Sequence, residues 1–239
     1  MKRLATKVAI VTGSSSGIGK AIALRLAEEG CRVVVAARRI AHCDKVVLQI
    51  QERGGDAASI PTDVTDEAQV DRLITETDKR FGRLDILINN AGIGGKGPIA
   101  EMSTQAFDQV LDTNLRGTFF CCRAGFRAMM KTGGGIIINM SSVCGVDAWA
   151  DTGSYSASTY GIMGLTKALA DEGRPYKIKA CAICPGGVAD ELVDASREEL
   201  ERSGLISPFD IADTVLYLVS LGPHATVHQI IVDRMGADW

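Results

Sequence analysis

The sequence predicts an α/β fold, a Rossmann-type doubly wound parallel sheet of about seven strands with helices on both faces. Short β-rich segments alternate with longer helical patterns along the chain. The β-rich segments are almost continuously apolar, which is typical of strands that helices cover on both sides. A glycine-rich turn also separates the first expected strand from the first expected helix. These three observations together favour a nucleotide-binding type of α/β domain.

Each expected strand combines β-branched and apolar residues between turn residues. The strands are expected at 7–12, 32–37, 57–63, 85–90, 135–140, 178–185 and 228–233. Helices are expected at roughly 17–30, 42–53, 66–80, 104–131, 154–173 and 208–221. Thr65 and Asp66 can cap the third helix, and Ser207 before Pro208, with Asp210 near, favours a helix start for the last. The alternation implies right-handed crossovers between parallel strands.

Length and composition are those of a globular domain with a large core. The chain has 239 residues, of which 46% are hydrophobic and 23% charged. A net charge of −3 gives no basic footprint, so we expect no nucleic-acid partner. The apolar run at 8–11 is too short for a signal peptide and no 18-residue apolar stretch follows, so we expect a cytoplasmic chain without membrane association. Without a linker or repeat, residues 1–239 should form a single domain, with a short substrate loop around 189–206.

The cysteines and histidines predict no disulfide and no metal site. Seven cysteines, an odd number without a secretion signal, are typical of reduced thiols. Cys181 and Cys184 form a CxxC pattern, but strand side chains three positions apart point to opposite faces. We therefore expect buried packing there rather than redox or metal chemistry. The histidines show no spacing typical of metal ligands.

The turn between the first strand and the first helix, "TGSSSGIG", predicts a phosphate cradle. Gly13, Gly17 and Gly19 let the backbone turn tightly and approach a ligand closely. The helix N-terminus offers free N–H groups to a pyrophosphate. Its place at the first strand–helix junction favours a dinucleotide site over a turn without a ligand.

The end of the second strand predicts the choice of cofactor. Enzymes of this fold that prefer NAD place an acidic residue there to bind the ribose 2′-hydroxyl. This chain has Ala37 followed by Arg38 and Arg39, and guanidinium groups suit a phosphate. We therefore expect NADP(H) rather than NAD(H), with Arg38 as the main contact. Two solvated surface arginines are the alternative.

Several motifs together resemble the short-chain dehydrogenase/reductase family. The matching features, in the same order and spacing from Lys7 to about Gly236, are the TGxxxGxG turn, Asn89-Asn90-Ala91-Gly92, Asn114, and Ser142 at 13 residues before Tyr155. The resemblance implies a Rossmann-type oxidoreductase that interconverts a small-molecule carbonyl and an alcohol by hydride transfer. It also implies a cofactor site made of Gly13, Ser15, Ser16, Ile18 and Gly19 at the pyrophosphate, Asp63 and Val64 at the adenine, Asn90, Ala91 and Gly92 beside the cofactor, and Pro185, Gly186 and Val188 beside the nicotinamide.

The resemblance implies catalytic roles as well. Ser142 would hydrogen-bond the substrate oxygen, Tyr155 would pass a proton to or from it, and Asn114 would hold a water in a proton relay. Each residue also has a structural alternative: Asn114 can merely kink its helix, and Ser142 can be a turn residue at a strand end.

The chain departs from the family pattern at two positions of the expected site. The family has a lysine where this chain has Thr159, and that lysine lowers the tyrosine pKa and holds the nicotinamide ribose. Without it, Tyr155 is expected to keep a pKa of about 10, which impairs turnover and favours reduction over oxidation. Asp190 stands where the family usually has a threonine near the cofactor amide and phosphates, so its charge is expected to weaken cofactor binding.

Two functions therefore stay open at this stage. The first is an NADP(H)-dependent carbonyl reductase or alcohol dehydrogenase with a weakened proton relay. The second is a catalytically silent relative that binds nucleotide, or only a partner protein, and acts by regulation or scaffolding. In either case the apolar helices at 114–131 and 154–173 predict a homodimer or homotetramer, because the family pairs them across a two-fold axis.

Overall fold

Seven strands form one parallel sheet in the computed structural model, which describes residues 3–235. The strands are β1 (Val8–Thr12), β2 (Arg32–Ala37), β3 (Ala57–Pro61), β4 (Ile86–Asn89), β5 (Gly135–Met140), β6 (Ile178–Pro185) and β7 (Gln229–Val232). Their order is β3-β2-β1-β4-β5-β6-β7, and every neighbouring pair is parallel. The predicted fold class is confirmed. Gly236, where the family resemblance was expected to end, lies outside the described residues.

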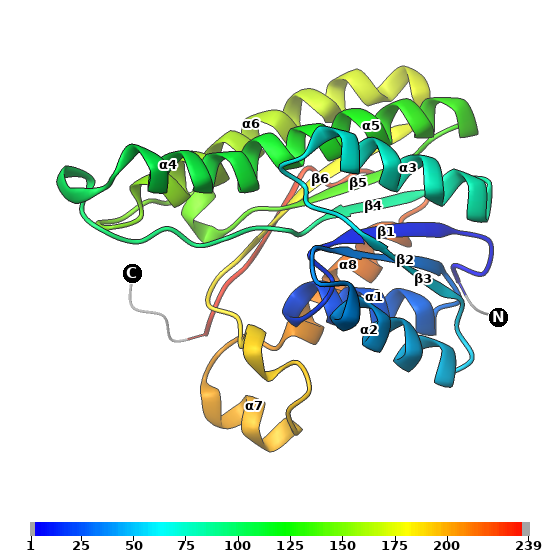
Figure 1. The fold of residues 1–239 in the computed structure, drawn as a ribbon, viewed down its shortest axis with the longest axis horizontal. Coiled ribbons are helices and arrows are strands. Elements are labelled where there is room, and N and C mark those ends of the chain that lie inside the picture. Colours follow the sequence, from blue (N-terminus) through cyan, green and yellow to red (C-terminus); the bar gives the residue numbers. More distant parts are fainter. Residues whose placement is uncertain (1–2, 236–239) are drawn as a thin grey trace.

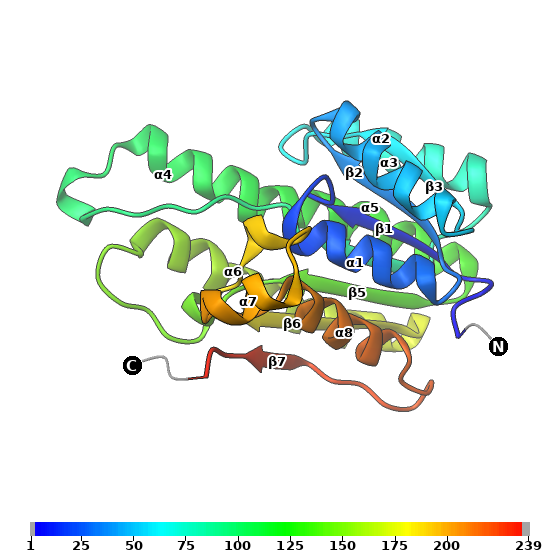
Figure 2. The ribbon, with the colours of Figure 1, turned by 90° about the horizontal axis from the view of Figure 1, so that it is seen from below.

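Helices cover both faces of this sheet (Figures 1 and 2). They are α1 (Gly17–Glu28), α2 (Ile40–Glu52), α3 (Glu67–Phe81), α4 (Thr104–Leu111), α5 (Gly117–Thr132), α6 (Gly153–Gly173), α7 (Arg197–Ser203) and α8 (Pro208–Val219). One face carries α1, α2 and α8, and the other carries α3 to α6. The chain order reverses between β1 and β4, which is where ligands bind in sheets of this type.

The continuous apolar runs of the strands fill two separate cores. In β1, Ala9 and Val11 belong to the core beneath α1 and α8, whereas Ile10 belongs to the core beneath α5 and α6. All three are fully buried. Since alternate side chains of a strand point to opposite faces, both faces of β1 need apolar residues.

The two expected helix starts are confirmed. Asp66 accepts hydrogen bonds from the backbone N–H groups of Ala68 and Gln69 at the start of α3. Ser207 and Asp210 form a reciprocal capping box at the start of α8, with Pro208 as its first residue.

Two helical details differ from the expectation. The helix expected at 104–131 occupies that range, but a π-helical turn at Asp112–Arg116 separates α4 from α5. A short helix, α7, lies inside the region expected to be a substrate loop. It stands clear of the sheet in Figure 1.

The cysteines are all buried and free. Cys181 belongs to the core beneath α1 and α8, whereas Cys184 lies 3.6 Å from the sulfur of Met163 on α6, so the CxxC side chains do point to opposite faces. Burial raises the pKa of the Cys181 thiol to about 12. Within residues 3–235, no group of three or more His, Cys, Asp or Glu side chains could hold a metal ion. No helix in the same range is long and apolar enough to cross a membrane.

Candidate active site

The glycine-rich turn packs directly against the segment that follows β4. Gly13 and Gly17 have φ of +66° and +53°, a region that favours glycine. A Cβ on Gly13 would lie 2.8 Å from the Cα of Ala91, and a Cβ on Gly19 would lie 2.6 Å from Nδ2 of Asn90. Glycine at these positions therefore lets the loops after β1 and β4 meet at the point where the chain order reverses.

Hydrogen bonds fix these two loops to each other. The Thr12 hydroxyl accepts from the backbone N–H groups of Asn90 (3.0 Å) and Ala91 (3.1 Å). The Asn90 side chain donates in return to the carbonyl oxygen of Thr12 (3.1 Å). This clamp is built from residues at the ends of two central strands, so it holds the cavity wall in a defined position.

Two adjoining cavities open along this edge of the sheet. One, of about 310 Å³, extends from Ser16 and Ile18 to Tyr155 and Thr159. The other, of about 290 Å³, lies beneath Arg38 and Arg39 and beside Asp63 and Val64. Both are lined by Gly13, Ala91, Gly92 and Ile93, so together they form an extended site. An elongated ligand such as a dinucleotide fits this shape, with Gly13 of the turn at its middle.

Most of the residues predicted for the site line one of these cavities, and four do not. Gly19 lies behind the turn against Asn90, Gly186 donates its N–H to Val232, and Val188 pairs with Ile206. The Ser142 hydroxyl accepts from the N–H of Cys144 (3.2 Å) and donates to the carbonyl oxygen of Pro185 (3.5 Å). The cavities also have lining residues that were not expected from the sequence: Thr62, Thr113, Met140, Ser141 and Ile162. Ser141 precedes Ser142, and Ile162 lies one helical turn beyond Thr159. Two of these residues could therefore have been identified from their closeness to the motif residues.

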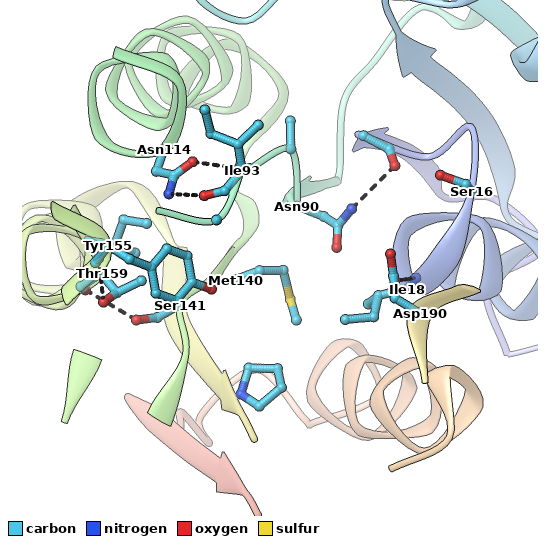
Figure 3. A pocket seen from close by; sticks show the side chains of 16 residues that line it. Ser16, Ile18, Asn90, Ile93, Asn114, Met140, Ser141, Tyr155, Thr159 and Asp190 are labelled. Atoms are coloured by element: carbon cyan, nitrogen blue, oxygen red, sulfur yellow. Dashed lines mark hydrogen bonds between the residues drawn. The ribbon is translucent and has the colours of Figure 1, made fainter. Parts of the chain in front are cut away.

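Tyr155 projects from α6 into the larger cavity (Figure 3). Burial raises the pKa of its phenol, and a hydrogen bond with Ser142 lowers it only in part. The expectation that this pKa stays at its ordinary value was wrong, because it took no account of burial. The phenol is consequently protonated at neutral pH.

Thr159 lies one turn further along α6 and is only 2% exposed. Its hydroxyl donates to the carbonyl oxygens of Tyr155 (3.0 Å) and Ser156 (3.2 Å). Such bonds to the preceding turn are common for threonine inside helices. The helix backbone thus holds the Thr159 hydroxyl. Thr159 and Tyr155 line the same cavity.

Asn114 sits in the π-helical turn and is buried. Its Oδ1 accepts from the N–H of Ile93 (2.8 Å), and its Nδ2 donates to the carbonyl oxygen of Ile93 (2.9 Å) and to the Ser158 hydroxyl (3.1 Å). The side chain therefore joins the segment after β4 to α6, and it positions one wall of the cavity. Its expected part in a water relay stays a prediction.

Asn89 is likewise a structural residue in the buried interior. Its Nδ2 donates to Oδ1 of Asn139 (2.8 Å), whose own Nδ2 donates to the Thr166 hydroxyl (2.8 Å). The chain of amides ties β4 to β5 and to α6 behind the cavity.

Known proteins resemble the chain over most of its length. The sequence model of the short chain dehydrogenase family matches residues 7–201. A 3-oxoacyl-acyl-carrier-protein reductase of Staphylococcus aureus is 39% identical over 224 residues, which are 90% of this chain and 91% of the relative. The structure of a metagenomic short-chain oxidoreductase in complex with NADP superposes with a TM-score of 0.86 and 32% identity, over 98% of this chain and 99% of that one. A variant of actinorhodin polyketide ketoreductase with NADPH gives a TM-score of 0.87 and 31% identity, over 95% of this chain and 96% of that one.

Proposed function

Because the chain belongs to the short-chain dehydrogenase family of oxidoreductases, we propose that it interconverts a carbonyl and an alcohol by hydride transfer with NADP(H). One observation carries this proposal: a single cavity joins the glycine-rich turn to the Tyr155 phenol. When bound, the nicotinamide supplies or accepts the hydride. The residues of the chain bind the cofactor, orient the carbonyl and hold the proton.

The choice of NADP(H) rests on the second cavity. Arg38 and Arg39 line it, and the Arg39 guanidinium lies 3.4 Å from the Ser15 hydroxyl in the phosphate turn. Two guanidinium groups beside this turn offer several donors to a 2′-phosphate. The two similar structures named above contain NADP and NADPH, which supports the same choice.

The catalytic role of Tyr155 rests on the larger cavity, which its residue lines. Tyr155 donates a proton to the carbonyl oxygen during reduction. Ser142 does not line this cavity, and it acts through its hydrogen bond with the Tyr155 phenol and turns its hydroxyl to the same oxygen when substrate binds. Thr159 replaces the lysine that family members use to lower the tyrosine pKa, so this chain keeps a neutral phenol. Since a neutral phenol is the acid that reduction needs, the activity is biased toward reduction and is weaker than with lysine.

The proposed unit is one domain over residues 1–239, with the segment at 189–206 beside the site as the substrate loop. It assembles as a homodimer or homotetramer through α5 and α6. Phe119 and Met130 on α5 are each 41% exposed and Tyr160 on α6 is 46% exposed, so these helices present apolar groups to solvent in the single chain.

NADPH consumption with a panel of aldehydes and ketones tests the proposal. We expect slow turnover by the wild type, further loss of at least about a hundredfold with Tyr155→Phe, and unchanged NADPH affinity in that variant. NADPH binding without turnover of any carbonyl would instead support a catalytically silent relative that acts as a regulatory or scaffold protein. This second function is favoured by one observation: the Thr159 hydroxyl is hydrogen-bonded to the helix backbone and does not act on the Tyr155 phenol.

A further inference from the structure

A carboxylate from a segment distant in sequence, that of Asp190, lies on the first turn of α1. Oδ1 of Asp190 accepts a hydrogen bond of 2.6 Å from the backbone N–H of Ile18. A Cβ added to Gly17 would lie only 1.9 Å from the same oxygen, so the carboxylate occupies the space that the glycine leaves open. Figure 3 shows Asp190 against Ile18, at the end of the cavity remote from Tyr155. An anion of this protein therefore already sits on the helix N-terminus.

The backbone delivers Asp190 to this position. The preceding residues are anchored, because Val188 pairs with Ile206 and the N–H of Ala189 donates to the carbonyl oxygen of Ile206 (2.9 Å). Asp190 then opens a short 3-10 turn over Asp190–Leu192. Its carboxylate reaches Ile18 from a segment that lies 172 residues away in sequence.

A second acidic residue of the same segment reinforces the contact. Lys20 on α1 is only 8% exposed in its side chain, and its ammonium bonds both oxygens of Asp194, at 2.6 and 2.8 Å. Asp190 and Asp194 thus attach the segment to the same turn of α1 at two points. If Asp190 acted on the pyrophosphate by charge repulsion alone, its carboxylate would not need to contact the first turn of α1. In the structure it does contact this turn.

We infer that Asp190 is an internal competitor of the cofactor pyrophosphate, which must displace its carboxylate from the Ile18 N–H before it can bind. The inference rests on the proposed NADP(H) site. A helix N-terminus stabilises any anion. The Ile18 N–H can donate a strong hydrogen bond either to the Asp190 carboxylate or to the pyrophosphate, but not to both at once. The apparent dissociation constant then equals the intrinsic value divided by the fraction of molecules in which the turn is free.

Competition and repulsion predict different effects of removing the charge. Under competition, Asp190→Ala tightens NADPH binding by about three- to tenfold, and it also lowers the thermal stability of the cofactor-free protein because a charge-assisted hydrogen bond is lost. Under repulsion, binding tightens while the cofactor-free protein loses no stabilising contact. Glu191, the exposed neighbour in the same turn, provides a matched control for charge.

NADPH titration by fluorescence should be run on the wild type, Asp190→Ala, Asp190→Asn and Glu191→Ala. Hydrogen exchange of the Ile18 amide, without cofactor, reports the contact itself. We expect tighter binding and faster Ile18 exchange in Asp190→Ala, a smaller gain in Asp190→Asn because it keeps an acceptor oxygen, and wild-type behaviour in Glu191→Ala.

Three results would overturn the inference. Equal tightening by Glu191→Ala would show a long-range charge effect. Equally fast exchange of the Ile18 amide in the wild type and in Asp190→Ala would show that the contact does not form in solution. A protected Ile18 amide together with no NADPH binding by any variant would make Asp190 a mere helix cap, and that result would also overturn the proposed function, whereas the first two would leave it standing.

Discussion

The substitution Thr159→Lys adds a charge to the cavity that holds the Tyr155 phenol. Both residues line the cavity of about 310 Å³, so the longer side chain has space to extend into it. The Thr159 hydroxyl that the substitution removes donates to the backbone carbonyl oxygens of Tyr155 and Ser156. We therefore expect the variant to fold and to place an ammonium group near the phenol.

The expected effect follows from the distance and the dielectric. Four residues along a helix rise about 6 Å. At an effective dielectric constant of about 20, an ammonium and a phenolate at that separation attract each other by about 3 kcal/mol. Such an attraction lowers the tyrosine pKa by about two units. Burial raises the wild-type pKa of Tyr155, and the added ammonium should counteract that rise and lower the pKa again.

The pH dependence of alcohol oxidation by NADP⁺ is the assay. Oxidation needs the phenolate, so the wild-type rate should rise about tenfold per pH unit through pH 10. The variant should reach its plateau about two units earlier and gain up to about a hundredfold at pH 8. Thr159→Met is the control, because it fills the cavity without a charge. An equal gain in Thr159→Met, or an unmoved pH profile in Thr159→Lys, would refute the role assigned to position 159.

Three further outcomes are expected. Arg38→Ala should weaken NADPH binding about tenfold and leave NADH binding unchanged in parallel titrations, and equal losses would contradict the 2′-phosphate contact. Burial would raise the pKa of Asp85, but hydrogen bonds from Arg83 and Lys7 outweigh it and lower that pKa. Asp85→Asn should therefore cost about 2 kcal/mol of unfolding free energy at pH 7 in urea titrations. The difference from wild type should begin to shrink as the pH falls below about 4, the ordinary pKa of an aspartate, and it should disappear only below the lowered pKa of the folded protein. A difference that does not change with pH would disprove the charge effect. Phe119→Lys should convert an assembly of two or more chains toward the 25.4 kDa monomer in light scattering, and a monomeric wild type would exclude the proposed interface.

The strands and the phosphate turn could be predicted because their signals are local. Apolar runs between turn residues placed each of the seven strands to within about two residues, and the capping residues of α3 and α8 are read from adjacent positions. The π-helical turn had no such signal. It accompanies a side-chain contact between Asn114 and Ile93, 21 residues apart.

The unpredicted features of the site depend on distant contacts. The pKa of Tyr155 depends on burial by several elements, which a helix pattern does not reveal. For Asp190, the sequence alone suggests only repulsion of the cofactor, because its charge and position do not reveal a hydrogen-bond partner. Its contact with Ile18 joins the last third of the chain to the first helix, and only the folded arrangement shows it.

A crystal structure of the protein with NADP⁺ is the most direct test of the central claim, that one cavity joins the cofactor site to the Tyr155 phenol. We predict the pyrophosphate on the first turn of α1 with Asp190 displaced, the 2′-phosphate beside Arg38, and the nicotinamide ring in contact distance of Tyr155. A nicotinamide ring that lies outside the cavity lined by Tyr155 and Thr159, with the rest of the cofactor in place, would contradict it.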